Sequence, residues 1–201
     1  MFRRLFQKKQ SNEQLIRALY GEIVAQARQA TFYRDFGAPD TLDGRFNMIV
    51  LHCFILFHRL KNETGGEREI SQAVFDMFRL DMDRSLREIG VGDTTVPKRM
   101  KKMMQVFYGR TQAYDKAADL SEPEAAMADA LQRNILSYND SLFEGEGDDS
   151  PDRDSKIADE KAKALSQYVL AAISHVEKQS TKDICGGSVS FPDPQSYIAT
   201  T

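Results

Sequence analysis

The feature that most limits the fold of this 201-residue chain is an apolar run, RFNMIVLHCFILFHRL, from Arg45 to Leu60. Its unbroken apolar part, residues 48–57, would form a helix only about 15 Å long, whereas the hydrocarbon core of a bilayer is about 30 Å thick. The run also contains His52 and is flanked by Arg45 and Arg59, which a lipid-embedded segment does not easily hide. It therefore predicts a helix in the core of a globular domain.

The two histidines of this run raise the question of a metal or haem site. His52 and His58 are six residues apart, which places them about 120° apart on a helix. A pair of helical metal ligands needs a spacing of three or four to share a face. We therefore predict no tightly bound metal and no cofactor. Haem handling by either histidine is the weakest alternative, because the apolar neighbours of both residues indicate burial.

Apolar residues recur at spacings of three and four along most of the chain, and no segment alternates as a half-buried strand does. The sequence therefore predicts an all-α fold, a single compact helical domain of about six or more helices, with its oligomeric state left open. The expected helices span about 11–27, 41–60, 67–90, 95–114, 121–142 and 158–182. The predicted core includes Ile49, Leu51, Phe54, Ile55, Val74, Phe78, Met82, Phe107 and Tyr108.

Three of these helices carry start signals. Ser11 with Gln14 and Ser121 with Glu124 have the spacing of a capping box. Asp40 is the expected N-cap of the helix over residues 41–60.

Composition divides the chain into three parts. Residues 1–10 are a basic N-terminal segment, for which a frayed end is expected, and residues 11–182 are the helical domain. Residues 183–201 are mixed in polarity, contain prolines, and are expected to form a flexible tail. Within the domain, residues 144–155 are acidic and rich in glycine, which predicts a solvated loop.

The charge balance gives no overall reason to expect nucleic acid binding, because 27 basic residues stand against 30 acidic ones. We expect no DNA partner. Cys53 and Cys185 form no disulfide framework and indicate a reducing compartment, the cytoplasm. The first residues, MFRRLFQKK, have neither a secretory nor a transit signal, so any work at a membrane is expected from outside the bilayer.

No catalytic template fits the sequence. It has no phosphate-binding glycine loop and no nucleophile elbow. Asp81 and Asp83 lie two residues apart, so a helix directs them to nearly opposite sides and they cannot act on one substrate atom. Asp83, Arg84 and Arg87, which we call the polar ridge, lie where surface ion pairs form on a helix. The sequence predicts a protein that is not an enzyme.

A second charged feature is the segment VPKRMKKMMQVFYGR. Here Lys98, Lys101 and Lys102, which we call the basic patch, lie beside methionines and aromatic residues. Such a helix suits an anionic lipid surface, RNA phosphates or an acidic partner. The alternative is an ordinary core helix with a basic outer face.

Four longer sequence segments are more specific for a protein family than any feature above. The segments LYGEIVAQAR, FYRDFGAPDTLDGRFNMIVLH, DMDRSLREIGVGDTTVPKRMKKM and FYGR lie between about Leu19 and Ala117. Together they closely resemble the ubiquinol-cytochrome c chaperone family, which are assembly factors of the cytochrome bc1 complex. The resemblance implies a non-enzymatic chaperone, in its bacterial form, that binds newly made cytochrome b from the cytoplasmic side of the inner membrane. Mitochondrial members also involve a small partner protein and the ribosome, but nothing in this sequence indicates either.

Joined with the local charges, the resemblance leads to a hypothesis about the binding surfaces. Cytoplasmic loops of membrane proteins are rich in Lys and Arg, so the polar ridge is expected to hold cytochrome b and the basic patch to meet the membrane surface. One alternative is that the ridge consists of intramolecular ion pairs joining two helices. Another is that the protein is a basic peripheral module that binds RNA or ribosomes.

Overall fold

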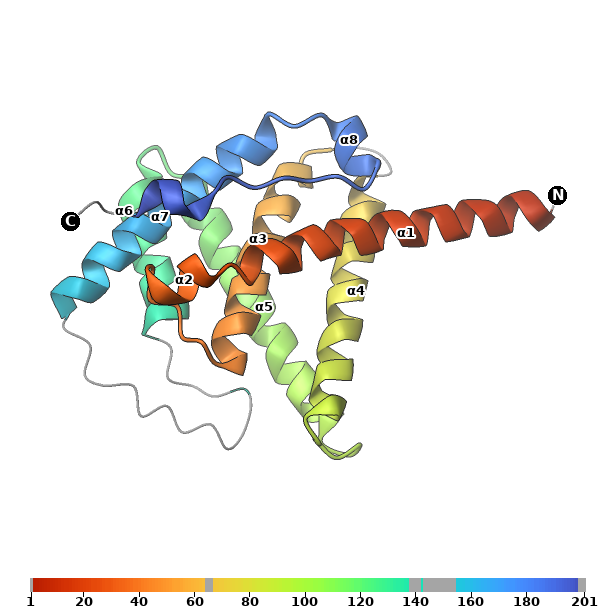
Figure 1. Cartoon of the computed structure of the whole chain (residues 1–201), viewed down its shortest axis with the longest axis horizontal. Coiled ribbons are helices and arrows are strands. Elements are labelled where there is room, and N and C mark those ends of the chain that lie inside the picture. Colours follow the sequence, from red (N-terminus) through yellow and green to blue (C-terminus); the bar gives the residue numbers. More distant parts are fainter. Residues whose placement is uncertain (1, 64–66, 138–141, 143–154, 199–201) are drawn as a thin grey trace.

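The computed structural model describes residues 2–63, 67–137, 142 and 155–198, and within these ranges every regular element is helical, as predicted (Figure 1). The predicted acidic loop lies outside the described residues except for Ser155, which begins a helix. The elements are α1 (Phe2–Ala27), α2 (Ala30–Arg34), α3 (Leu42–Leu60), α4 (Glu67–Glu88), α5 (Val96–Ala118), α6 (Pro123–Leu131), the π-helical turn η1 (Gln132–Leu136), α7 (Ser155–Glu177), α8 (Thr181–Cys185) and the 3-10 turn η2 (Pro194–Tyr197).

Helix α3 is the centre of the molecule. Helices α1, α4, α5 and α7 pack around it (Figure 1), and all its residues from Phe46 to Leu56 are buried. The charged residues at its two ends pair locally: Arg45 with Asp40 at 2.8 Å, and Arg59 with Glu63 at 2.6 Å. The prediction that the apolar run forms a core helix is therefore confirmed.

The turn that leads into α3 corrects one predicted cap. The N-cap is Thr41 and not Asp40, because the Thr41 hydroxyl accepts a hydrogen bond from the Gly44 amide at 3.1 Å. Gly37 has a φ of +78°, a conformation that side chains disfavour. A Cβ on Gly44 would lie 1.8 Å from the carbonyl oxygen of Pro39, so only glycine fits there.

Helix α1 corrects a second predicted start, because it begins at Phe2 and continues through Ser11 without a break. The residues before Ser11 include Arg, Leu, Gln and Lys, which favour a helix, and no Pro or Gly interrupts them. The first residue of a capping box must have a non-helical backbone conformation. Ser11 lies inside a continuous helix, so it cannot be that residue. Farther along α1, the Tyr20 hydroxyl donates to Asp81 of α4 at 2.7 Å.

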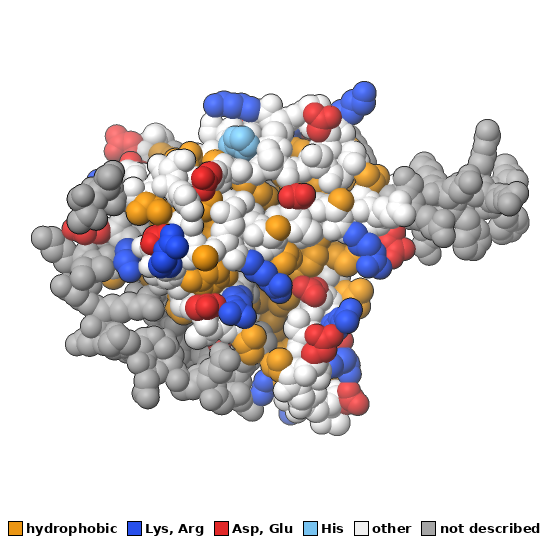
Figure 2. Space-filling view, in the orientation of Figure 1, with side chains coloured by type: hydrophobic (Ala, Val, Ile, Leu, Met, Phe, Trp, Pro, Cys, Tyr) orange, Lys and Arg blue, Asp and Glu red, His pale blue; other side chains and the backbone are white. Residues whose placement is uncertain are grey.

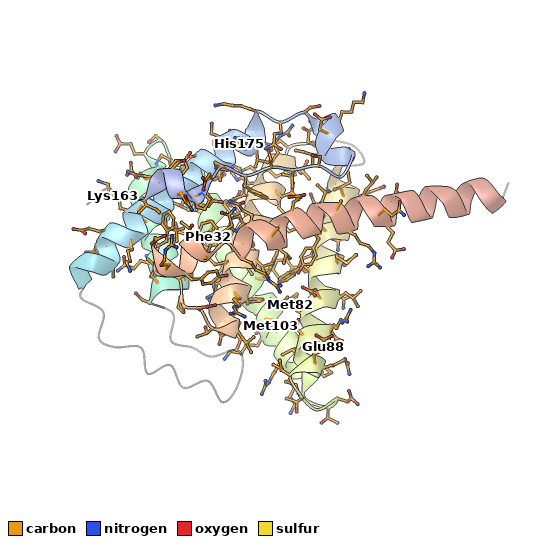
Figure 3. All side chains as sticks on the ribbon, in the orientation of Figure 1. Phe32, Met82, Glu88, Met103, Lys163 and His175 are labelled. Atoms are coloured by element: carbon orange, nitrogen blue, oxygen red, sulfur yellow. The ribbon has the colours of Figure 1, made fainter. Side chains whose placement is uncertain are left out.

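Helices α4 and α5 form a hairpin whose tip lies at the lower end of Figure 1. Gly90 ends α4 with a φ of +89°, and the Val91 amide donates back to the carbonyl of Leu86, as in a Schellman cap. Figure 3 shows Met82 of α4 and Met103 of α5 between the helices, and both are buried. The predicted end of this helix, at about residue 90, is confirmed to within two residues.

The start of α6 is a third correction. The helix begins at Pro123 with Glu122 as its N-cap, and no side chain caps it, so Ser121 does not form the expected capping box. Glu124 instead faces α7, where its carboxylate accepts a hydrogen bond from Gln167 at 3.1 Å and its carbonyl accepts one from Ser166. Helix α6 packs closely along α7.

Residues 183–198 differ from the flexible tail that their composition predicts. Helix α7 ends at Glu177, before the expected Lys182, and α8 follows after a short turn. The chain then runs back across α1 and α3 as an extended segment (Figure 1), which we call the C-terminal strap, residues 186–198. Its buried and ring-stacked residues anchor it, and residues 199–201 lie outside the described part.

Several contacts hold the strap. Val189 and Pro194 are buried, and the ring of Phe191 lies edge-on to His52 at 5.3 Å. The Gln179 side chain donates to the Ser190 carbonyl at 2.7 Å and accepts from the Ser190 amide at 2.9 Å, as a neighbouring strand would. These contacts make the strap part of the core.

The predicted core is confirmed at eight of its nine positions, all buried, namely Ile49, Leu51, Phe54, Ile55, Val74, Phe78, Met82 and Phe107. The prediction for Tyr108 was wrong, because this side chain is 58% exposed. Arg110, two residues later, is buried instead; its guanidinium donates to Asn47 and lies 5.9 Å above the ring of Phe46. Among the described helices, none is long and apolar enough to span a bilayer.

Candidate functional site

A large groove of about 1340 Å³ lies between the end of α3, the start of α4 and the middle of α5. We call it the α3–α4–α5 groove. It forms because α4 and α5 meet at the hairpin tip and separate toward their other ends, leaving α3 as the floor (Figure 1). Its lining includes Phe54, Phe57, His58, Lys61, Arg68, Glu69, Gln72, Phe75, Asp76, Phe107, Tyr108, Thr111, Gln112 and Asp115.

Aromatic rings make up the apolar part of the groove. The ring of Phe75 on α4 lies 5.1 Å from Phe107 and 5.6 Å from Tyr108 on α5, and Phe57 of α3 lies 6.2 Å from Phe107. Phe57 and Phe75 are half-buried and Tyr108 is exposed. An apolar surface of this kind, bordered by polar side chains, marks a site for another apolar surface.

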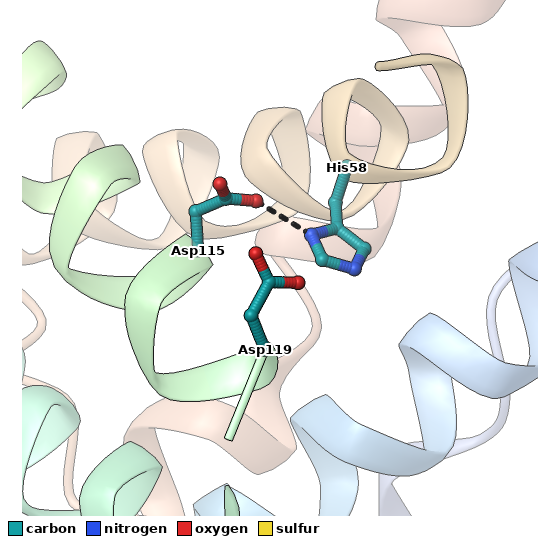
Figure 4. Close-up of side chains that lie close together, drawn as sticks. All are labelled: His58, Asp115 and Asp119. Atoms are coloured by element: carbon teal, nitrogen blue, oxygen red, sulfur yellow. Dashed lines mark hydrogen bonds and ion pairs between the residues drawn. The ribbon is translucent and has the colours of Figure 1, made fainter. Parts of the chain in front are cut away.

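The end of the groove where α3 and α5 finish is polar (Figure 4). The His58 Nδ1–H donates to the Asp115 carboxylate at 2.7 Å, and the Lys61 ammonium donates to Asp115 at 3.1 Å and to Asp119 at 2.9 Å. Partial burial acts to raise the pKa of Asp115, but the hydrogen bonds from His58 and Lys61 outweigh it and hold that pKa below its usual value. We call these four residues the polar cluster.

The polar cluster has the kinds of side chain that bind a metal ion, but a lysine already occupies the space between its carboxylates. Ligand atoms of His58, Asp115 and Asp119 all lie within 4.8 Å of one another. The Lys61 ammonium, however, is hydrogen-bonded to both carboxylates, where it already supplies the positive charge that an ion would bring. The arrangement is therefore that of an ion-pair cluster with one resident cation.

His52 is a core residue, as the apolar run predicted. It is fully buried, its Nδ1–H donates to the Met48 carbonyl at 2.8 Å, and its Nε2 accepts from the Tyr168 hydroxyl at 2.8 Å. Gln26 donates to that hydroxyl and to the Pro192 carbonyl, both at 3.0 Å, which ties α1, α7 and the strap together. Burial lowers the pKa of His52 to about 4, so the ring is neutral at pH 7.

The polar ridge lies on the last turns of α4 as a set of ion pairs within one stretch of chain. Arg84 pairs with Glu88 at 2.7 Å, and Arg87 pairs with Asp83 at 2.8 Å and also with Asp93. The hydrogen bond from Arg87 holds the pKa of Asp83 below its usual value. These pairs do not join two helices, as one alternative expected, and they leave the ridge on the surface.

The basic patch begins at Lys98, the third residue of α5, so it lies at the same hairpin tip as the ridge. All three of its lysines are exposed. Figure 3 marks this tip by Glu88, and Figure 2 shows positive and negative side chains intermixed around it. The structure therefore brings the two predicted surfaces together at one end of the molecule and places neither in the groove.

A second hollow, of about 620 Å³, lies where α1, α2 and α3 meet. Its lining is charged, with Arg28, Arg34, Asp40 and Arg45 around Tyr33. Arg34 pairs with Asp35 at 2.7 Å, and Arg45 pairs with Asp40. Because Arg34, Arg45 and Asp40 are already ion-paired and Tyr33 is the single aromatic residue of its lining, it is a weaker candidate than the α3–α4–α5 groove.

This chain matches a known protein family. The model of the ubiquinol-cytochrome C chaperone family matches residues 34–191. The match extends well beyond Ala117, where the quoted segments end, and it includes α6, α7 and the first part of the strap, residues 186–191.

Two individual proteins are similar to this chain. A crystal structure of the Cbp3 homolog from Brucella abortus superposes with a TM-score of 0.77 and 38% identity, covering 97% of this chain and 98% of that one. The ubiquinol-cytochrome-c reductase complex assembly factor 1 of Xenopus laevis is 25% identical over 105 residues, 52% of each chain. This chain therefore matches about half the length of that relative.

Proposed function

We propose that this chain, which belongs to the ubiquinol-cytochrome C chaperone family, is a non-enzymatic assembly chaperone that holds newly made cytochrome b during assembly of the bc1 complex. It would meet this client at the cytoplasmic side of the inner membrane, as a peripheral protein. Family membership supports the assembly role, and the α3–α4–α5 groove supports the chaperone mechanism.

The aromatic lining of the groove is the observation that carries this mechanism. A newly made membrane protein exposes apolar helices that must be covered until they pack. A helix about 10 Å wide fills roughly 400 Å³ per turn, so a groove of about 1340 Å³ takes about three turns. The half-buried rings of Phe57 and Phe75 and the exposed ring of Tyr108 supply the apolar contact.

Replacing Tyr108 with glutamate is expected to reduce the amount of co-purified cytochrome b by about tenfold, because it places a charge in the apolar part of the groove. The fold should persist, since this side chain is 58% exposed. The measurement is quantitative immunoblotting of cytochrome b after affinity purification of the chaperone from membranes.

Leu80→Glu is the matched control, since Leu80 is 62% exposed on α4 and does not line the groove. It should leave cytochrome b at wild-type levels. Equal recovery of cytochrome b with both variants would show that the client binds elsewhere.

The polar ridge and the basic patch are proposed as additional surfaces at the hairpin tip, for the client and the membrane respectively. Charge reversal at Asp83 and Arg84 should lower the recovery of cytochrome b, because the client would meet opposite charges. Neutralising the three lysines of the patch with glutamine should reduce binding to anionic vesicles.

Asp83 is half-buried and the other four altered side chains are exposed, so each variant should give a wild-type circular dichroism spectrum. If both bind cytochrome b and anionic vesicles as the wild type does, the proposed roles of the hairpin tip are wrong.

A further inference from the structure

We infer that the α3–α4–α5 groove is directional: it takes an apolar helical segment whose Lys- or Arg-rich flank lies at the polar cluster. This inference rests on the proposed function, and it names which part of the client the groove recognises. Its starting point is that aromatic rings line the groove, whereas the polar cluster lies at the end where α3 and α5 finish. Arg68, Glu69 and Asp76 of α4 are the other charged side chains of the lining.

Two independent sources of negative potential converge at the polar cluster. The first is the pair of carboxylates, Asp115 and Asp119, which stand close enough together to share one ammonium group. The second is backbone: α3 ends at Leu60 and α5 ends at Ala118, so the C-terminal ends of two helices lie beside the carboxylates. Each helix C-terminus carries about half a negative charge.

Lys61 partly neutralises this potential and shows what the cluster binds. It is the residue just after α3, and its side chain reaches both carboxylates while remaining 30% exposed. A lysine on a flexible stem can leave such a site at little cost, because exposed ion pairs contribute little. A cation from a bound segment can therefore take its place, and a guanidinium has the fork that two carboxylates accept.

The remaining charges of the groove favour the same occupant. Acidic residues outnumber basic ones along its lining, with Glu69, Asp76 and Asp115 against Lys61 and Arg68. Membrane helices carry Lys and Arg in their short cytoplasmic flanks. A segment of about three turns with such a flank would place apolar residues on the rings and cations at the cluster, whereas an acidic flank would meet like charge.

The test uses three synthetic fluorescent peptides that share one apolar helix of about three turns. They differ only in a C-terminal pair of lysines, serines or glutamates. Fluorescence anisotropy with the full chain should give affinities in the order Lys, Ser, Glu, with the Lys peptide about fivefold tighter than the Glu peptide. Because each variant is compared on the same peptides, differences in peptide helicity cancel.

Three variants place the preference at the cluster. In the double variant Asp115→Asn and Asp119→Asn, the Lys peptide should bind less than about twofold more tightly than the Glu peptide. In Lys61→Met, this preference for the Lys peptide should be larger than in the wild type. Asp129→Asn, an exposed carboxylate on α6 outside the groove, should leave the ratio unchanged.

The outcomes separate this inference from the proposed function. If wild type binds all three peptides equally, or if the double variant keeps the preference, the groove is not directional, although peptide binding itself would still support a client groove. If none of the peptides binds, the groove is not the client site, and the directional inference and the proposed mechanism both fail.

Discussion

The substitution Phe54→Ala is expected to lower the free energy of unfolding by about 3 to 5 kcal/mol. Phe54 is almost fully buried on α3, and its ring contacts those of His58 and Tyr114 at centroid distances of 5.5 Å. Removing it loses the burial of the ring and leaves a cavity. Because α3 is packed by helices on several sides, the backbone cannot close that cavity. Urea unfolding followed by circular dichroism at pH 7 gives the value.

Leu80→Ala is the control for this measurement. Leu80 lies on the surface of α4, so its truncation should change the free energy of unfolding by no more than about 0.5 kcal/mol. A loss at Phe54 as small as that at Leu80 would mean that the centre of the molecule is not packed as described.

Acidification from pH 7 to pH 4 is expected to remove about 3 kcal/mol of stability through His52 alone. The folded protein holds the ring neutral with a pKa of about 4, whereas in the unfolded chain the pKa is the usual value of about 6.5. Below pH 6.5 the unfolded state binds a proton that the folded state does not, so stability falls as the pH falls. The loss is complete once the pH is below the folded pKa, and above pH 6.5 His52 contributes no pH dependence.

His52→Gln isolates this contribution, because it removes the titrating ring but keeps a polar side chain that can accept from Tyr168. The free energies of unfolding of both proteins are measured by urea titration at several pH values from 4 to 7. The free energy of unfolding of the wild type should fall toward that of His52→Gln as the pH falls through this range. Curves that remain parallel would show that His52 does not stay neutral in the fold.

The helices of the core could be predicted because their signals are local. The apolar run of α3 and the spacing of Val74, Phe78 and Met82 on α4 each indicate a buried helical face without reference to the rest of the chain. Helix starts were predicted less well. Asp40 has the right chemistry for a cap, but so does its neighbour Thr41, and the turn geometry selects between them. Ser121 also has that chemistry, yet α6 begins after it with no side-chain cap.

Tyr108 shows why the groove could not be predicted. It follows the buried Phe107 and lies 100° from it on the helix, so periodicity alone allows both to face the core. The distinction depends on how far α4 separates from α5, which is a property of the packed hairpin. The polar cluster could not be predicted either, because His58 and Asp115 are 57 positions apart in the chain.

The strap was misjudged for a different reason. Glycines and prolines in residues 183–201 are typical of a loosely held segment, and they outweighed Val189, Phe191 and Tyr197 in the prediction. Those three apolar side chains are the ones that attach the strap, and Tyr197 lies edge-on to Tyr168 at 5.9 Å. A few apolar residues among turn residues can anchor an extended segment when the rest of the domain provides an apolar surface for them to pack on.

The strap also bears on when this domain can finish folding. Chains are made from the N-terminus, so α1 and α3 leave the ribosome well before residues 186–198. Until then, His52 lacks the covering ring of Phe191, and Gln26 lacks the Pro192 carbonyl that accepts its hydrogen bond. The central helix of this chaperone is therefore itself incompletely covered during translation, and its interior closes only when the strap has been synthesised.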